Sequence, residues 1–126
     1  MIEEAVNKLR LEAEKFIPSL LGILLIDEYG FPIANSLSTS FEDPIVVSGL
    51  ISTATAMMEN SLKELSNSDF ELLYAQGNKI SIFVGKVGKF YLSFITNPSV
   101  KVGTIFMEYK VLKPKLEEIL RQFQEV

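Results

Sequence analysis

Residues 43–65 read DPIVVSGLISTATAMMENSLKEL, and the rest of the chain is organised around this stretch. Asp43 followed by Pro44 is typical of a helix N-terminus, because an Asp side chain caps free backbone N–H groups and Pro fits the first helical position. No further Pro and a single Gly occur before Leu65. The stretch therefore predicts one long helix.

One side of this helix is apolar. At 100° per residue, the following residues fall on one stripe: Val47, Leu50, Ile51, Ala54, Met58, Leu62 and Leu65. A stripe of this width is typical of a helix that packs on a globular core. We therefore expect these side chains to face the core.

The opposite side carries small residues where long charged ones would favour helix and solubility. Small side chains allow close approach of a second backbone. We expect a second chain to contact this side through Val46, Gly49, Ser52, Thr53, Ala56, Met57 and Asn60. Two alternatives stay open: another part of the same chain covers the patch, or Ser and Thr are tolerated on a solvated face.

Composition excludes several kinds of function. The 126 residues predict one domain, 1–126, large enough for its own core. The chain has no Cys and no His, which excludes disulfides, thiolate nucleophiles, common zinc sites and imidazole-based triads. The net charge is −4 and the basic residues are scattered, which argues against nucleic acid as a partner.

Membrane insertion and secretion are also disfavoured. The longest apolar run, residues 20–26, is far shorter than the ~20 residues needed to span a bilayer. The N-terminal residues MIEEAVNKLRLEAEK lack the basic start and apolar middle of a signal peptide. We expect a cytoplasmic protein.

Eight elements are predicted along the chain. An amphipathic helix over 2–17 precedes strands at 20–26 and 32–37, and the long helix leads to strands at 70–75, 79–86 and 90–96 and a last helix after Asn97-Pro98-Ser99. Gly77-Asn78 and Gly88-Lys89 supply tight hairpin turns. The order predicts an α+β fold with a five-stranded antiparallel sheet and helices on both faces.

The strand order follows from burial. Strand 20–26 is apolar on both faces, so we expect it inside the sheet beside 90–96, with 32–37 and 70–75 at the two edges. The first edge begins with a Pro and ends polar, which protects it, whereas FELLYA has one charge and no Pro. We expect this second edge to pair with another chain through Phe70, Glu71, Leu72, Leu73 and Tyr74.

Pro114 falls inside the last helix without breaking its apolar stripe. Ile105, Tyr109, Leu112, Leu116, Ile119, Leu120 and Phe123 stay in phase across it. This favours one long helix bent at Pro114. The alternative is two helices, with Pro114 at the first position of the second.

No chemical motif stands out. Asp27-Glu28 and Glu117-Glu118 are neighbouring carboxylates that are usually solvated in such positions. The run GKVGK, residues 85–89, lies in a hairpin and lacks the strand-to-helix context of a phosphate loop. We therefore predict no catalytic residue, no cofactor and no metal site, and not an enzyme.

Three segments resemble the Roadblock (dynein light chain) family: GILLIDEYGFPIANS, ISTATAMMENSLKEL and NPSVKVGTIFMEYKVLKPKLEEIL. The resemblance covers nearly the whole chain and implies a profilin- or longin-like Roadblock fold. It also implies dimerisation through the central helix and the strand after it, as a homodimer or with a paralogue. Family members bind and regulate small Ras-like GTPases, or link subunits of larger complexes, without catalysis. Pro114 and the length of the last helix depart from the family pattern.

Two further functional classes stay open at this point. Longin and profilin folds serve trafficking and actin binding, and related modules sense small ligands in a cavity beside the sheet. A sensor needs a few polar groups on the sheet. Ser81, Ser93 and Thr96 are the candidates.

Overall fold

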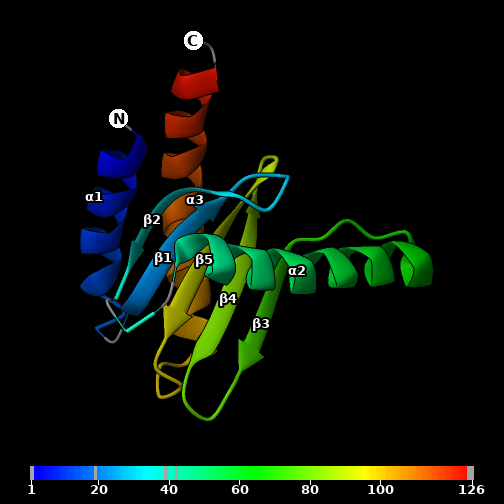
Figure 1. Cartoon of the computed structure of the whole chain (residues 1–126), viewed down its shortest axis with the longest axis horizontal. Helices are drawn as coiled ribbons and strands as arrows, with labels where there is room; N and C mark the ends of the chain where they lie inside the picture. Colours follow the sequence, from blue (N-terminus) through cyan, green and yellow to red (C-terminus); the bar gives the residue numbers. More distant parts are fainter. Residues whose placement is uncertain (1, 19, 39, 42, 125–126) are drawn as a thin grey trace.

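The structure is a computed structural model that describes residues 2–18, 20–38, 40, 41 and 43–124. Its elements are α1 (Ile2–Glu14), β1 (Leu20–Ile26), β2 (Pro32–Leu37), α2 (Pro44–Ser66), β3 (Leu72–Gln76), β4 (Ser81–Val87), β5 (Phe90–Thr96) and α3 (Val102–Gln124). The strands form one antiparallel sheet in the order β2-β1-β5-β4-β3 (Figure 1). The predicted fold class, strand neighbours and two edges are confirmed.

The predicted ends of several elements differ from the observed ones. β1, β2 and β5 have the predicted bounds, whereas β3 begins at Leu72 and β4 at Ser81, each two residues later than predicted. Just before β3, Glu71 O accepts one backbone hydrogen bond from β4, donated by Lys86 N at 2.9 Å. Phe70 instead turns inward and packs on the ring of Tyr91.

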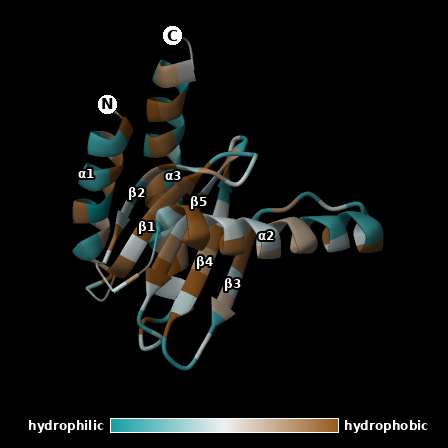
Figure 2. Ribbon diagram, in the orientation of Figure 1, coloured by the Kyte–Doolittle hydropathy of each residue, from teal (hydrophilic) through white to brown (hydrophobic). Residues whose placement is uncertain are grey.

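The core has two layers, one on each face of the sheet. α1 and α3 cover one face, where their apolar sides meet Phe83, Leu92 and Phe94. α2 crosses the other face above Leu24, Val84 and other apolar strand residues. Figure 2 shows the hydrophobic residues concentrated on the inner strands. Burial on both faces explains why β1 is apolar throughout.

α3 is one continuous helix through Pro114, so the two-helix alternative is wrong. Its Tyr109 ring lies directly on Gly85 of β4 and against Phe83, with ring centroids 5.2 Å apart. The Tyr109 hydroxyl donates a hydrogen bond to the backbone oxygen of Lys86. Burial raises the pKa of Tyr109 to about 12, so the phenol stays protonated at ordinary pH. The absence of a side chain at position 85 is thus what fixes the distance between α3 and the sheet.

The predicted core stripe of α2 is wrong in part. Leu50, Ala54, Met58 and Leu65 are exposed, whereas the buried residues of this helix are Ser48, Ile51 and Thr55. Small side chains let the helix approach the sheet closely, and their hydroxyls are satisfied locally: Ser48 donates to Gly30 O at 2.7 Å and Thr55 to Ile51 O at 2.8 Å. Part of the small-residue face is therefore covered by the chain's own turn and sheet.

The C-terminal half of α2 extends beyond β3, which is the strand at one edge of the sheet (Figure 1). The helix is defined at both ends: the Asp43 side chain caps Ile45 N at 2.9 Å, and Asn67 in the left-handed conformation (φ 53°) ends it. Leu65, in its last turn, is 86% exposed. This C-terminal half of α2, which we call the overhang, therefore carries apolar surface that the described residues do not cover.

The other edge of the sheet has a different environment. α1 lies beside β2 (Figure 1), and the Arg10 guanidinium donates to the backbone oxygen and hydroxyl of Ser36 at 2.6 and 2.8 Å. Pro32 opens the strand, where it removes one backbone donor. Pro32 is the protection predicted for this edge, whereas the contact with α1 and Arg10 was not predicted.

A buried carboxyl makes stability depend on pH. Glu108 of α3 is 4% exposed, and burial, then the charge of Glu12 on α1, raises its pKa, while Lys115 acts in the opposite direction. A carboxyl with a raised pKa stabilises the fold in its protonated form, and this contribution is lost as pH rises through the folded-state pKa. We expect Glu108→Gln to raise the melting temperature at pH 7, with the difference from the natural chain vanishing at low pH.

Thermal unfolding of both chains between pH 4 and 8 measures this difference directly. The exposed Glu117→Gln on the same helix serves as the control and should change stability little. Equal stability of Glu108→Gln and the natural chain at every pH would show that the Glu108 carboxyl is well solvated when charged.

Candidate interaction surfaces

The predicted contact residues on α2 lie along its exposed side, with two exceptions, Gly49 and Ser52. Val46 and Met57 are 47% and 67% exposed, and Thr53, Ala56 and Asn60 are also exposed. Gly49 and Ser52 are half-buried, and the Ser52 hydroxyl donates to Ser48 O at 2.8 Å. A side chain at Gly30 would meet Ser52 Oγ at 2.7 Å, so this turn of the chain already occupies the Ser52 side.

The predicted contact residues of the edge strand divide into two groups. Phe70 is 8% exposed and serves its own core, whereas Glu71 and Leu72 are exposed and Leu73 and Tyr74 are half-buried. Among the described strands, β3 pairs with β4 alone, so one side of β3 has free backbone groups. An unpaired apolar edge is a site where another strand adds.

Sequence reasoning missed an apolar groove between α2 and the outer strands. It has a volume of about 120 Å³ and is lined by Leu50, Ile51, Ala54, Leu73, Ala75, Ile82 and Val84. Leu50, 70% exposed, stands on its rim. The available signal was that apolar residues occupy more of the α2 circumference than one packed face requires.

We call the exposed residues of α2 from Val46 to Leu65, the groove and the free edge of β3 together the α2–β3 surface. Its apolar members are spread along the helix: Val46, Leu50, Met57, Met58 and Leu65 are all more than 40% exposed. Isolated exposed hydrophobic residues are ordinary, but five on one helix next to an open sheet edge are typical of a protein interface.

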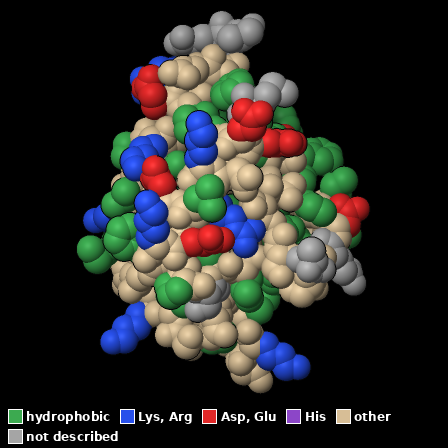
Figure 3. Space-filling model, turned by 90° about the vertical axis from the view of Figure 1, so that its left-hand side faces the viewer, with side chains coloured by type: hydrophobic (Ala, Val, Ile, Leu, Met, Phe, Trp, Pro, Cys, Tyr) green, Lys and Arg blue, Asp and Glu red, His purple; other side chains and the backbone are tan. Residues whose placement is uncertain are grey.

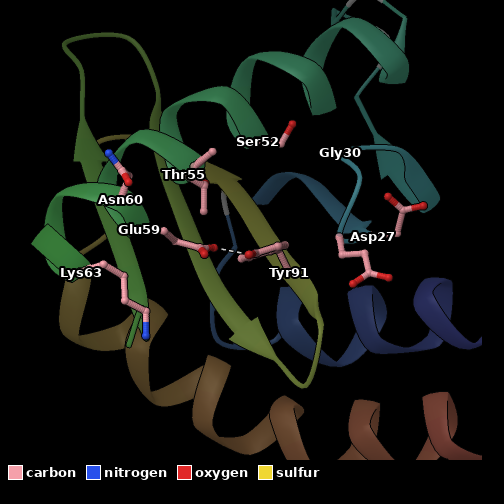
Figure 4. A pocket seen from close by; sticks show the side chains of 10 residues that line it. Asp27, Gly30, Ser52, Thr55, Glu59, Asn60, Lys63 and Tyr91 are labelled. Atoms are coloured by element: carbon pink, nitrogen blue, oxygen red, sulfur yellow. Dashed lines mark hydrogen bonds between the residues drawn. The ribbon is translucent and has the colours of Figure 1, made fainter. Parts of the chain in front are cut away.

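A polar pocket lies on the other side of α2 (Figure 4). It has a volume of about 370 Å³ and is formed by the β1–β2 turn, α2 and Tyr91 of β5. Glu59 accepts a hydrogen bond from the Tyr91 hydroxyl, which in turn accepts one from Lys86 Nζ at 3.0 Å. Asp27 Oδ1 holds the turn by accepting from Tyr29 N and Phe31 N, each at 2.9 Å.

The polar groups of this pocket are used to hold the structure together. Burial, followed by the hydrogen bond to Glu59, raises the pKa of Tyr91, which keeps the phenol protonated. Lys63 forms an ion pair with Asp69 at 2.6 Å, which lowers the pKa of that carboxyl. No cluster of His, Cys, Asp or Glu among the described residues could hold a metal ion.

The three residues predicted for a ligand sensor do not form one site. Ser81 and Thr96 are cross-strand partners. Ser93 lies on the α2 face of β5, the face that also carries Tyr91, two residues before it. All three hydroxyls are buried and have no hydrogen-bond partner among the described residues. None of the three lines the polar pocket or the groove. The predicted grouping is therefore wrong.

Charged side chains are mixed on the end of the molecule shown in Figure 3. Lysines and arginines lie between exposed hydrophobic side chains on its left-hand half, and acidic groups are interspersed. No helix among the described residues is long and apolar enough to cross a membrane.

Comparison with known proteins identifies the fold. No protein-family description and no curated protein sequence matches the chain. Solved structures do: MglB in a tetrameric arrangement has a TM-score of 0.81 at 18% identity, over 95% of this chain and 90% of that one. The gliding protein MglB from Thermus thermophilus gives 0.80 at 18% identity, over 95% and 91%. A Roadblock/LC7 domain from Streptomyces avermitilis gives 0.68 at 13%, over 83% and 92%.

Proposed function

With the Roadblock fold shared by these structures as the premise, we propose that this chain is a non-catalytic dimeric adaptor that binds and regulates a small Ras-like GTPase. The supporting observation is the α2–β3 surface, in which a projecting helix with exposed apolar residues lies beside an unpaired strand. The partner is a second copy of the chain or a paralogue, and the setting is the cytoplasm.

A two-fold arrangement accounts for the geometry of this surface. If the β3 edges of two copies pair antiparallel, one sheet continues through both, and the overhang of each α2 comes to lie above the other copy's outer strands. Leu50, Ala54 and Met57 of one helix then face the other helix, and the groove beside Leu73 receives apolar side chains. Small residues such as Gly49 and Ala56 permit close helix packing.

The GTPase part of the proposal rests on the Roadblock resemblance of sequence and fold. A paired α2 surface gives a broad, non-catalytic platform, and the exposed Glu28 in the polar pocket beside it offers a carboxylate to basic groups of a partner. Such a platform changes the activity of a GTPase by positioning its loops, with no reactive group of its own.

Affinity purification of the tagged chain from its native cell, with and without a non-hydrolysable GTP analogue, tests this function. We expect a small GTPase, identified by mass spectrometry, whose recovery depends on the nucleotide. Recovery should be lost with Leu50→Asp and retained with Leu11→Asp, a matched change at an exposed position of α1. Absence of any GTPase under both nucleotide conditions would refute the regulatory role.

A further inference from the structure

The first half of α3 carries an exposed apolar stripe on its outer side. Met107 and Val111 are 70% and 51% exposed, and Pro114 is exposed as well. At 100° per residue, Lys110 and Lys115 lie about 70° to either side of the centre of this stripe. We call these five residues the α3 outer face.

Positive charge is concentrated around this face. Residues 101–115 contain four lysines and one glutamate, whereas the rest of the chain contains eight basic and fifteen acidic residues. The single glutamate, Glu108, is buried away from the stripe. Lys115 pairs with Glu12 at 2.8 Å, but Lys101, Lys110 and Lys113 form no ion pair among the described residues. An acidic chain thus has one locally basic helix surface.

The lysine side chains near the stripe leave its apolar residues accessible. Lys110 Nζ lies 4.7 Å from the Phe106 ring centroid and Lys113 Nζ 5.9 Å from that of Tyr109, so both side chains lie along the helix and leave the stripe open. Lys110 thus borders the stripe without covering Met107 or Val111.

We propose that the α3 outer face binds an acidic amphipathic helix of a partner protein. Apolar side chains of that helix cover Met107 and Val111, and its carboxylates pair with Lys110 and Lys115. A protein segment fits better than a membrane, because the stripe is only one residue wide and the carboxylates of Glu117 and Glu118 lie just beyond it. A flat anionic bilayer would meet those carboxylates, whereas a helix can avoid them.

This site is separate from the α2–β3 surface. α3 covers the face of the sheet opposite to α2, so a dimer built through α2 and β3 leaves both copies of the α3 outer face free. Binding at α3 and GTPase binding can therefore succeed or fail independently.

Titration of the ¹⁵N-labelled full chain with a synthetic peptide, followed by NMR, tests the proposal. The probe is an 18-residue, end-capped helical peptide of Leu, Ala and Glu, with Leu on one face and Glu on both flanks; its control has Lys in place of every Glu. We expect shift changes centred on residues 107–115 with the acidic peptide only, weakened by added salt.

Variants locate the binding and separate it from alternatives. Lys110→Glu and Met107→Ser should each weaken binding at least about tenfold, whereas Lys79→Glu and Leu11→Ser, exposed elsewhere, should not. Vesicles of phosphatidylcholine with and without phosphatidylserine form a second arm, and no binding is expected. Failure of the acidic peptide to bind, equal binding of the basic peptide, or binding of serine-lipid vesicles that Lys110→Glu abolishes would each overturn the proposal.

Discussion

Leu50→Asp is expected to convert the protein from a dimer to a monomer. Leu50 stands at the rim of the apolar groove and is 70% exposed, so the change leaves the core of the single chain intact. In the dimer it would place an unpaired carboxylate between apolar surfaces. Loss of a central interface residue typically costs about 2–4 kcal/mol, which raises the dissociation constant roughly 30- to 1000-fold.

Size-exclusion chromatography with light scattering at tens of micromolar measures this effect. Leu11→Asp is the matched control, since Leu11 is similarly exposed but lies on α1. Ala56→Asp tests which side of α2 forms the dimer contact, because Ala56 borders the polar pocket whereas Leu50 borders the groove. A natural chain that is already monomeric, or a Leu50→Asp variant that stays dimeric, would contradict the proposed interface.

Gly85→Ala is expected to destabilise the fold by about 2–3 kcal/mol, which corresponds to a fall in melting temperature of about 8–12 °C. A methyl group at this position would lie 2.5 Å from Tyr109 Cζ. The ring cannot move aside easily, because it is packed against Phe83 and its hydroxyl is bonded to Lys86 O. The strain therefore falls on the packing of α3 against β4.

A double-mutant cycle isolates the contact. Tyr109→Leu removes the ring, so the combined variant should be more stable than the sum of the two single changes predicts, by at least about 1 kcal/mol. Gly103→Ala is the control, since nothing lies within 4 Å of a side chain there, and a helical alanine is favourable by up to about 1 kcal/mol. Additive effects at positions 85 and 109 would show that the Tyr109 ring does not cause the instability of Gly85→Ala. All chains must be compared at one protein concentration.

The strand arrangement was predictable because burial alone decides it. An all-apolar strand such as β1 must lie inside the sheet, and the segments opened by Pro32 or preceded by a polar break belong at its edges. The continuous α3 was predictable for a related reason, since the apolar stripe keeps its phase through Pro114.

The orientation of α2 was not predictable in the same way. A hydrophobic stripe says that a face is covered, but it does not say whether the same chain or another molecule covers it. Here Ser48 and Thr55 face the sheet because the helix lies close to it, and Leu50 and Leu65 are left outside. The lone hydroxyls of Ser81, Ser93 and Thr96 likewise suggested a shared cavity, although their strand positions place them apart.

The two edges of the sheet differ, and this difference limits how far the sheet can extend by adding further molecules. With α1 and Arg10 against β2, hydrogen-bonded extension is available from β3 only. If two molecules pair through β3, the unpaired edge of each becomes hydrogen-bonded, and neither has an edge left for a third molecule. A sheet with two unpaired edges could lengthen into a fibre, whereas the proposed pairing through β3 would end in a closed pair.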